Sequence, residues 1–132
     1  MVWRVIDLLS VIAISIGASL GAVSRWVVGV LLNDIFPAIP LGTLGVNLVG
    51  GYLIGVALSY FAHAPHIAAE WRLLIVTGFL GSLTTFSTFS MESASLLRNE
   101  KYLSCALLIL AHVGGSITMT LLGIATFAVL RR

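Results

Sequence analysis

Hydroxyl side chains are crowded into one short stretch of an otherwise apolar sequence. Six of them fall within nine positions, and two phenylalanines lie among them: Ser82, Thr84, Thr85, Ser87, Thr88 and Ser90, with Phe86 and Phe89. One Ser or Thr inside a helix bonds back to the carbonyl four residues earlier and has little consequence. Six of them, directly after two glycines, predict a helix that is kinked or unwound. A break frees backbone carbonyls, which suit a small hard cation, and exposes N–H and hydroxyl donors, which suit an anion.

Two other apolar segments each carry polar side chains at a spacing of four residues. This spacing places residues on one face of a helix, and it joins Thr43 to Asn47, and His112 to Ser116 and Thr120. The Asn47 amide offers two N–H donors. Each face alone is explained by hydrogen bonds between helices, which contribute about 0.6 kcal/mol each in membranes. Three polar faces in so short a chain favour a polar conduit.

The conduit is predicted to be lined by uncharged groups. Four carboxylates lie at the ends of the apolar segments or between them, and Glu92 lies toward one end of the hydroxyl-rich segment: Asp7, Asp34, Glu70 and Glu100 are the four. A proton-coupled pump usually has a buried titratable group, and a cation pore often has a ring of carboxylates. Neutral donors favour a small anion that is held weakly enough to leave. The positive edges of Phe86 and Phe89 suit the same ion, although packing is the simpler interpretation of the two rings.

The composition places these side chains in a membrane protein. The chain has 132 residues, of which 59% are hydrophobic and 9% charged, and its mean hydropathy is +1.11. Since a soluble domain carries about 25% charged residues, a soluble monomer is excluded, and so is a disordered chain. The single cysteine, Cys105, allows no disulfide within the chain, and the net charge of +2 is too small to indicate nucleic-acid binding. No nucleophile–base pair, metal-ligand cluster or phosphate loop points to an enzyme.

Four apolar stretches are long enough to cross a bilayer as helices, which takes about 20 residues each. We predict spans at about 8–32, 41–61, 73–97 and 102–130, forming a single domain over residues 1–132. The predicted fold is all-α and polytopic, with a break in the third span. A β-barrel is excluded because period-two alternation is absent. Arg4 precedes the first apolar stretch as in a signal peptide, but that stretch is longer than the usual apolar core, so we interpret it as a span.

Positive charges are divided almost equally between the two sides of the membrane. The side of the termini collects four and the other side three: Arg4, Arg72, Arg131 and Arg132 against Arg25, Arg98 and Lys101. Orientation follows a clear Lys/Arg bias, and this chain provides almost none. Insertion in both orientations, and hence an antiparallel homodimer, is one interpretation. The other interpretation is that the sequence determines topology only weakly, without functional meaning.

Small residues recur at four-residue spacing within three of the predicted spans. The pairs are Gly17 with Gly21, Gly51 with Gly55, and Ala111 with Gly115. Missing side chains at this spacing let helices approach closely in lipid. The glycines therefore predict tight helix packing, within the chain or with a second subunit, and do not reveal the chemistry.

Three segments carry motifs by which a family is identified. They are GFLGSLTTFSTFSME at 78–92, GTLGVNLVG at 42–50 and GASLGAVSR at 17–25. These segments resemble the third-, second- and first-helix motifs of the Fluc (CrcB-type) fluoride channels. The motifs follow in the family's order, and the resemblance covers nearly the whole chain. The TTFSTFS run is highly specific, whereas the glycine pairs alone are weak signals.

The resemblance implies a passive, fluoride-selective channel that exports fluoride from the cytoplasm of a prokaryote and so lowers fluoride toxicity. Such channels are dual-topology homodimers in the plasma (inner) membrane, with two antiparallel subunits and two pores. By resemblance, the pore contains Phe86, Phe89 and the Asn47 amide, with Ser87 and Thr88 near the pathway.

The resemblance also implies a structural sodium ion at the dimer interface. Gly81 and Thr84 resemble the break residues whose backbone carbonyls hold that ion. Arg25 resembles a first-helix arginine near the vestibule; the alternative is that it extends to the membrane interface.

Thr43, His112 and Ser116 complete the predicted pore. On the last helix some family members carry a tyrosine and serines at four-residue spacing, whereas this chain has His112, Ser116 and Thr120, with Leu108 one turn earlier. A histidine that only bonds between helices is the alternative for His112.

Two other functional classes fit part of the sequence. A small dual-topology multidrug or cation exporter has a similar size and charge balance, but it needs a carboxylate inside the first helix. Residues 8–24 contain none. A structural subunit of a larger membrane complex is the second alternative, and such a chain would be inert when purified alone.

Overall fold

The computed structural model describes residues 7–36 and 38–132 of the chain. Arg4 and Pro37, which entered the charge and loop predictions, lie outside the described residues. Three of the crossings are continuous helices. The remaining one, which is third along the chain, is assembled from four shorter elements. The continuous helices are α1 (Leu8–Leu32), α2 (Leu41–His63) and α6 (Tyr102–Leu130); the third crossing runs through α3 (Ala69–Arg72), η2 (Leu73–Leu80), α4 (Gly81–Leu83) and α5 (Phe86–Arg98).

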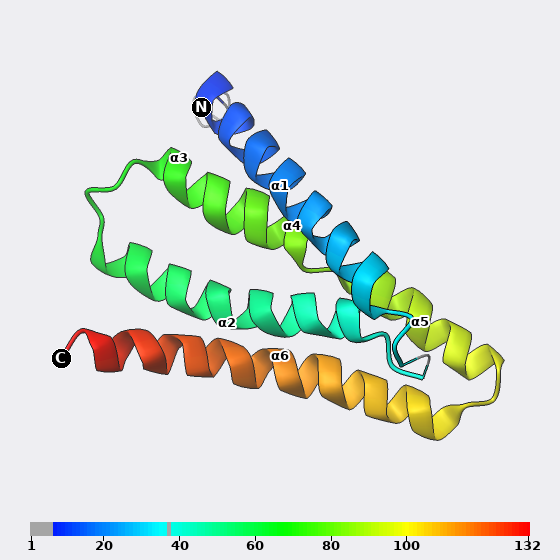
Figure 1. Ribbon diagram of the computed structural model, residues 1–132. Helices are drawn as coiled ribbons and strands as arrows, with labels where there is room; N and C mark the ends of the chain where they lie inside the picture. The colour runs from blue at the N-terminus through cyan, green and yellow to red at the C-terminus, as the bar shows by residue number, and fades with distance from the viewer. Residues whose placement is uncertain (1–6, 37) are drawn as a thin grey trace.

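All four crossings are long and apolar enough to span a membrane, with the third running from Ala69 to Arg98. The prediction of an all-α protein with four spans is therefore confirmed. The start of α1 and the end of α6 lie at the same end of the molecule, as an even number of crossings requires (Figure 1). The second helix ends at His63 and the third crossing begins at Ala69, so both continue beyond the predicted limits of 61 and 73. Uncharged stretches underestimate helix length because interfacial polar residues also continue a helix.

One half of the fold is a close pair formed by α2 and α6, which run side by side (Figure 1). Glycines make this approach possible. A Cβ added at Gly55 would overlap the carbonyl oxygen of Thr120, and a Cβ at Gly123 would overlap that of Tyr52. The two backbones are therefore in direct contact, as the small-residue spacing predicted.

The other half of the fold packs α1 against η2 and α4. Gly17 lies against the carbonyl oxygen of Leu74, and Gly21 lies against that of Phe79. The η2 segment is a π-helix, in which the Gly81 N–H reaches the carbonyl of Val76 five residues earlier. The η2 and α4 elements of this half lead directly into the break in the third crossing.

The break itself lies at Thr84 and Thr85. Thr84 has φ −81° and ψ 155°, and Thr85 has φ −148° and ψ 121°, so two successive residues are extended between α4 and α5. The predicted interruption of the third helix is confirmed. Of the two residues expected at the break, Thr84 is extended, while Gly81 lies three residues earlier and keeps helical dihedrals of −63° and −29°. The helix stops later because Thr85 acts as the N-cap of α5, accepting a bond from the Thr88 N–H at 3.1 Å.

The glycine contacts allow a test of the α2–α6 pair. Alanine normally stabilises a helix relative to glycine by about 1 kcal/mol, but Gly55→Ala is expected to destabilise the fold by roughly 1–3 kcal/mol because the methyl group displaces the facing backbone. Thermal unfolding in detergent measures the change. Gly45→Ala is the matched control on the same helix, since its added Cβ meets no atom of another described element within 4 Å. Equal stability of the two variants would contradict the packing described here.

Candidate functional site

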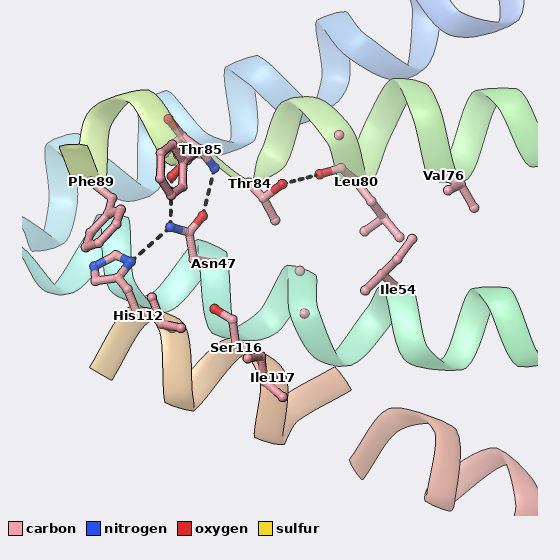
Figure 2. A pocket seen from close by; sticks show the side chains of 15 residues that line it. Asn47, Ile54, Val76, Leu80, Thr84, Thr85, Phe89, His112, Ser116 and Ile117 are labelled. Carbon is pink, nitrogen blue, oxygen red and sulfur yellow. Dashed lines mark hydrogen bonds between the residues drawn. The ribbon is translucent and has the colours of Figure 1, made fainter. Parts of the chain in front are cut away.

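A cavity of about 460 Å³ opens where α2, α6 and the break in the third crossing meet (Figure 2). It brings together seven of the eleven residues predicted for the pore, the vestibule and the sodium site: Asn47, Gly81, Thr84, Phe86, Phe89, His112 and Ser116. Four others do not line it: Arg25, Thr43, Ser87 and Thr88. No acidic residue, lysine or arginine is among the lining residues. The cavity wall is therefore apolar and aromatic, with a few neutral polar groups.

The Asn47 side chain holds the broken strand of the third crossing in place. Its Oδ1 accepts a hydrogen bond from the Thr85 N–H at 2.7 Å, and its Nδ2 donates to the Thr85 carbonyl at 2.9 Å. Nδ2 also lies 3.0 Å from Nδ1 of His112 (Figure 2). One amide thus joins α2, the break and α6, and it pairs with Thr85 as a neighbouring β-strand would. The Thr85 N–H, which a continuous helix would have satisfied, is satisfied by this side chain instead.

The same bonds leave backbone carbonyls without their usual helical donors. The carbonyl of Gly81 would normally accept from the N–H of Thr85, but that N–H is bonded to Asn47. The carbonyl of Thr84 would normally accept from the N–H of Thr88, which is bonded to the Thr85 hydroxyl. Within the described parts of the chain, neither carbonyl accepts a hydrogen bond from backbone or side chain. These are hard, neutral oxygen donors of the kind that bind small cations.

Among the described residues, side chains provide no alternative metal site to these carbonyl oxygens. Across residues 7–36 and 38–132, no group of three or more His, Cys, Asp or Glu side chains is placed to hold a metal. Backbone carbonyl oxygens beside the cavity are thus the ligands available to a cation at this site.

Arg25 reaches the break from α1 and is not among the residues that line the cavity. Its Nε donates to the carbonyl of Ser82 at 3.0 Å, and its side chain is half-buried. The carbonyl of Ser82 has also lost a helical donor at the break, so the guanidinium takes over that role. The contact fastens α1 to α4.

Two phenylalanine rings form the aromatic wall of the site. The rings of Phe86 and Phe89 lie 5.4 Å apart at 65°, an edge-to-face arrangement. Phe89 is also stacked on the His112 imidazole, with centroids 4.7 Å apart and an angle of 26°. Phe89 is buried at 7% exposure, whereas Phe86 is 77% exposed. The two rings therefore differ: Phe89 is fixed inside the subunit and Phe86 projects from it.

The Ser87 and Thr88 hydroxyls take part in the cap of α5. Oγ1 of Thr85 lies 3.2 Å from the Ser87 hydroxyl and 3.0 Å from that of Thr88. Part of the hydroxyl-rich run therefore secures the restart of the helix after the break.

A second polar cluster, which the sequence analysis missed, lies one helical turn from the Asn47 cluster. Thr43 donates its hydroxyl to Oε1 of Glu92 at 2.6 Å, and its N–H bonds to Oδ1 of Asn33 at 3.0 Å. The other carboxylate oxygen, Oε2, is buried without a partner among the described residues. The signal was available, because Thr43 precedes Asn47 by four positions and Glu92 follows Phe89 by three.

The chain is similar over nearly its full length to a known group of proteins. Residues 12–124 match the family described as CrcB-like protein, Camphor Resistance (CrcB). A relative from Tolumonas auensis, named fluoride-specific ion channel FluC, is 58% identical over 125 residues, which cover 95% of this chain and 98% of the relative. A relative of the same name from Pseudomonas paraeruginosa is 59% identical over 87% of this chain and 91% of its own length. A third, from Chromobacterium violaceum, is 54% identical over 93% of this chain and 98% of its own. The chain belongs to the CrcB family.

Proposed function

We propose that this chain is a fluoride-selective channel that lets fluoride leave the cytoplasm passively. The observation that carries the proposal is the 58% identity, over 95% of the chain, to a protein named fluoride-specific ion channel FluC. The character of the cavity supports it, since neutral donors and ring edges suit an anion that must bind and leave. An energy-coupled exporter is disfavoured because α1, from Leu8 to Leu32, contains no carboxylate.

Fluoride is small and strongly hydrated, so its path must replace lost water without trapping the ion. We assign this task to several weak sites along the path rather than to one strong site. The cavity contributes Phe86, Phe89, His112 and Ser116, with Asn47 shaping its wall, and Thr43, Ser87 and Thr88 extend the polar path beyond it. Arg25 supplies positive potential near the vestibule.

The functional unit is an antiparallel homodimer in this proposal. The cavity is not enclosed, and it is bordered by the exposed ring of Phe86 and by carbonyls that accept no hydrogen bond among the described residues. Such backbone groups are not tolerated against lipid, so protein must cover them. A second copy in the opposite orientation fits the nearly equal numbers of positive charges on the two sides.

A structural sodium ion at the dimer interface completes the proposed site. The carbonyl oxygens of Gly81 and Thr84, with their counterparts in the second copy, form a neutral oxygen set suited to a small hard cation. When bound, the ion adds fixed positive potential near the anion path. The protein is a multi-pass membrane protein, and we assign it to the inner membrane of a prokaryote because the relatives named above come from bacteria.

Fluoride efflux from liposomes that contain the purified chain tests the function. The wild-type chain is expected to release fluoride rapidly and chloride very slowly. Phe86→Ile removes a ring edge, and Asn47→Asp places a negative charge in the path, so each is expected to lower fluoride efflux by about tenfold or more. Thr126→Val is the control, since among the described residues the Thr126 hydroxyl bonds to the Leu122 carbonyl of its own helix and to no other group. Chloride efflux equal to that of fluoride would refute selectivity, and an inert chain would favour a structural subunit.

Labelling of single cysteines in intact cells tests the dual topology. In a Cys105→Ser background, Asn99→Cys and His66→Cys place a thiol in loops at opposite ends of the bundle. A membrane-impermeant reagent added from outside is expected to label about half of the molecules of each variant, because both orientations are equally populated. Complete labelling of one variant and none of the other would show a single orientation.

Exchange of sodium for N-methylglucamine tests the proposed ion. Without a small cation to hold the carbonyls of Gly81 and Thr84, both the thermal stability of the dimer and fluoride efflux are expected to fall. Restoring sodium is expected to recover both quantities, and choline at the same ionic strength is not. Identical stability and efflux in the two media would argue against the ion.

A further inference from the structure

A second cavity, which shares no lining residue with the first, lies at the end of the bundle where α2 and α6 end. It measures about 490 Å³, and its lining residues come from the last turns of these two helices and from the two residues that follow α6. Both helices are long and apolar enough to span a membrane, and they run side by side to this end (Figure 1). The cavity therefore lies where the hydrocarbon core of a bilayer meets the headgroups.

One wall of the second cavity is apolar and aromatic. Ile124, Phe127 and Ala128 line it from α6. The ring of Phe127 is held between two others: the centroid of the His63 imidazole lies 5.4 Å from it at 34°, and that of the Tyr60 ring lies 6.4 Å from it at 83°. A preformed apolar wall of this kind suits the carbon chain of an amphipathic ligand.

The His63 imidazole is fixed in this wall from its own helix. Its Nδ1 lies 2.7 Å from the Ser59 carbonyl and donates to it, since a carbonyl can only accept. The Ser59 hydroxyl is also engaged within α2, because it donates to the Gly55 carbonyl at 2.8 Å. The polar groups that α2 contributes to the cavity are thus bonded along their own helix, and an anion has to be bound from α6.

The α6 side of the second cavity carries two guanidinium groups. Arg131 and Arg132 line it, and no acidic residue is among the described residues that do so. The backbone continues the turn of α6 at both positions, because the N–H of Arg131 bonds to the Phe127 carbonyl and that of Arg132 to the Val129 carbonyl, each at 3.2 Å. A guanidinium binds two phosphate oxygens through parallel N–H donors. The cavity is therefore complementary to a phosphate group that is attached to an apolar chain.

We propose that the second cavity binds an anionic phospholipid, with Arg131 and Arg132 donating to its phosphate and with Ile124 and Phe127 in contact with the start of an acyl chain. The apolar wall and the position at the membrane boundary favour a lipid over a soluble phosphate. A zwitterionic lipid is disfavoured because its ammonium group would lie near the two guanidinium groups. The inference needs only a chain that spans a membrane and does not depend on which ion the chain conducts.

Native mass spectrometry of the purified full chain in detergent tests the lipid site, with dioleoyl phosphatidylglycerol as the anionic probe and dioleoyl phosphatidylcholine as the zwitterionic one. The wild-type chain is expected to bind the anionic probe more tightly. Arg131→Gln with Arg132→Gln is expected to weaken that binding by about tenfold, which corresponds to about 1.4 kcal/mol, and to leave binding of the zwitterionic probe unchanged. Equal affinity of the wild type for the two probes would overturn the proposal.

Arg98→Gln with Lys101→Gln is the matched control, because it removes the same two positive charges from the turn between α5 and α6, at the other end of the bundle. This variant is expected to bind the anionic probe as the wild type does. If it loses as much affinity as the Arg131 and Arg132 variant, general attraction between charges accounts for the binding and the proposed site is wrong.

Glycerol 3-phosphate separates a lipid from a soluble ligand, since it carries a phosphate without acyl chains. It is expected not to displace phosphatidylglycerol at equal concentration, and Phe127→Ala, which keeps both arginines, is expected to weaken lipid binding. Displacement by glycerol 3-phosphate would overturn the assignment of a lipid.

Thermal unfolding provides a second measurement that does not depend on lipid surviving in the gas phase. A ligand that binds only the folded chain raises its unfolding temperature. Phosphatidylglycerol is expected to stabilise the wild type and the Arg98 and Lys101 control, but not the Arg131 and Arg132 variant. Equal stabilisation of all three would place the lipid elsewhere and overturn the proposal. Fluoride efflux is measured separately, so a chain that does not conduct would refute the proposed function and leave this test intact.

Discussion

A helix that breaks inside a bilayer must find new partners for the backbone groups it no longer pairs, because lipid offers none. At Thr84 and Thr85 this constraint is met by one amide, that of Asn47, which takes both the N–H and the carbonyl of Thr85. The guanidinium of Arg25 takes a third group, the carbonyl of Ser82. The remaining free carbonyls border the cavity. Some backbone groups at the break are paired with side chains, and others are not. The unpaired carbonyls mark where the site lies.

The scaffold around the break is rigid because its helices touch through their backbones. Gly55 and Gly123 bring α2 against α6, while Gly17 and Gly21 bring α1 against η2 and α4. Lipid provides no hydrophobic drive between helices, so close packing of this kind must supply the cohesion. Rigid helices in turn hold Asn47 within 3 Å of its partners on both the break and α6. Glycines without functional side chains thus determine how precisely the polar side chains of the site are positioned.

The sequence predicted the elements better than the contacts among them. Long uncharged stretches define four spans because a bilayer tolerates little else, and dense hydroxyls with nearby glycines signal a break. The backbone remains helical at Gly81, since flexibility alone does not end a helix; the cap by Thr85 and its pairing with Asn47 do. The bond between Thr43 and Glu92 joins two different helices, which residue spacing along one helix does not predict. Side-chain partners on different helices depend on helix rotation, which periodicity within one helix does not fix.

The position of a polar residue beside a cavity does not by itself make it a ligand. Asn47 and His112 both line the cavity, but the amide has used every hydrogen on neighbouring groups while the imidazole keeps one. Donors that are fully paired within the protein can shape a path, and only donors with a hydrogen to spare can replace the water of an ion. The aromatic rings follow the same division, because Phe89 is committed to His112 whereas Phe86 projects from the subunit. Under the proposed function, the groups that the fold leaves unpaired are the ones that would line the path of the ion.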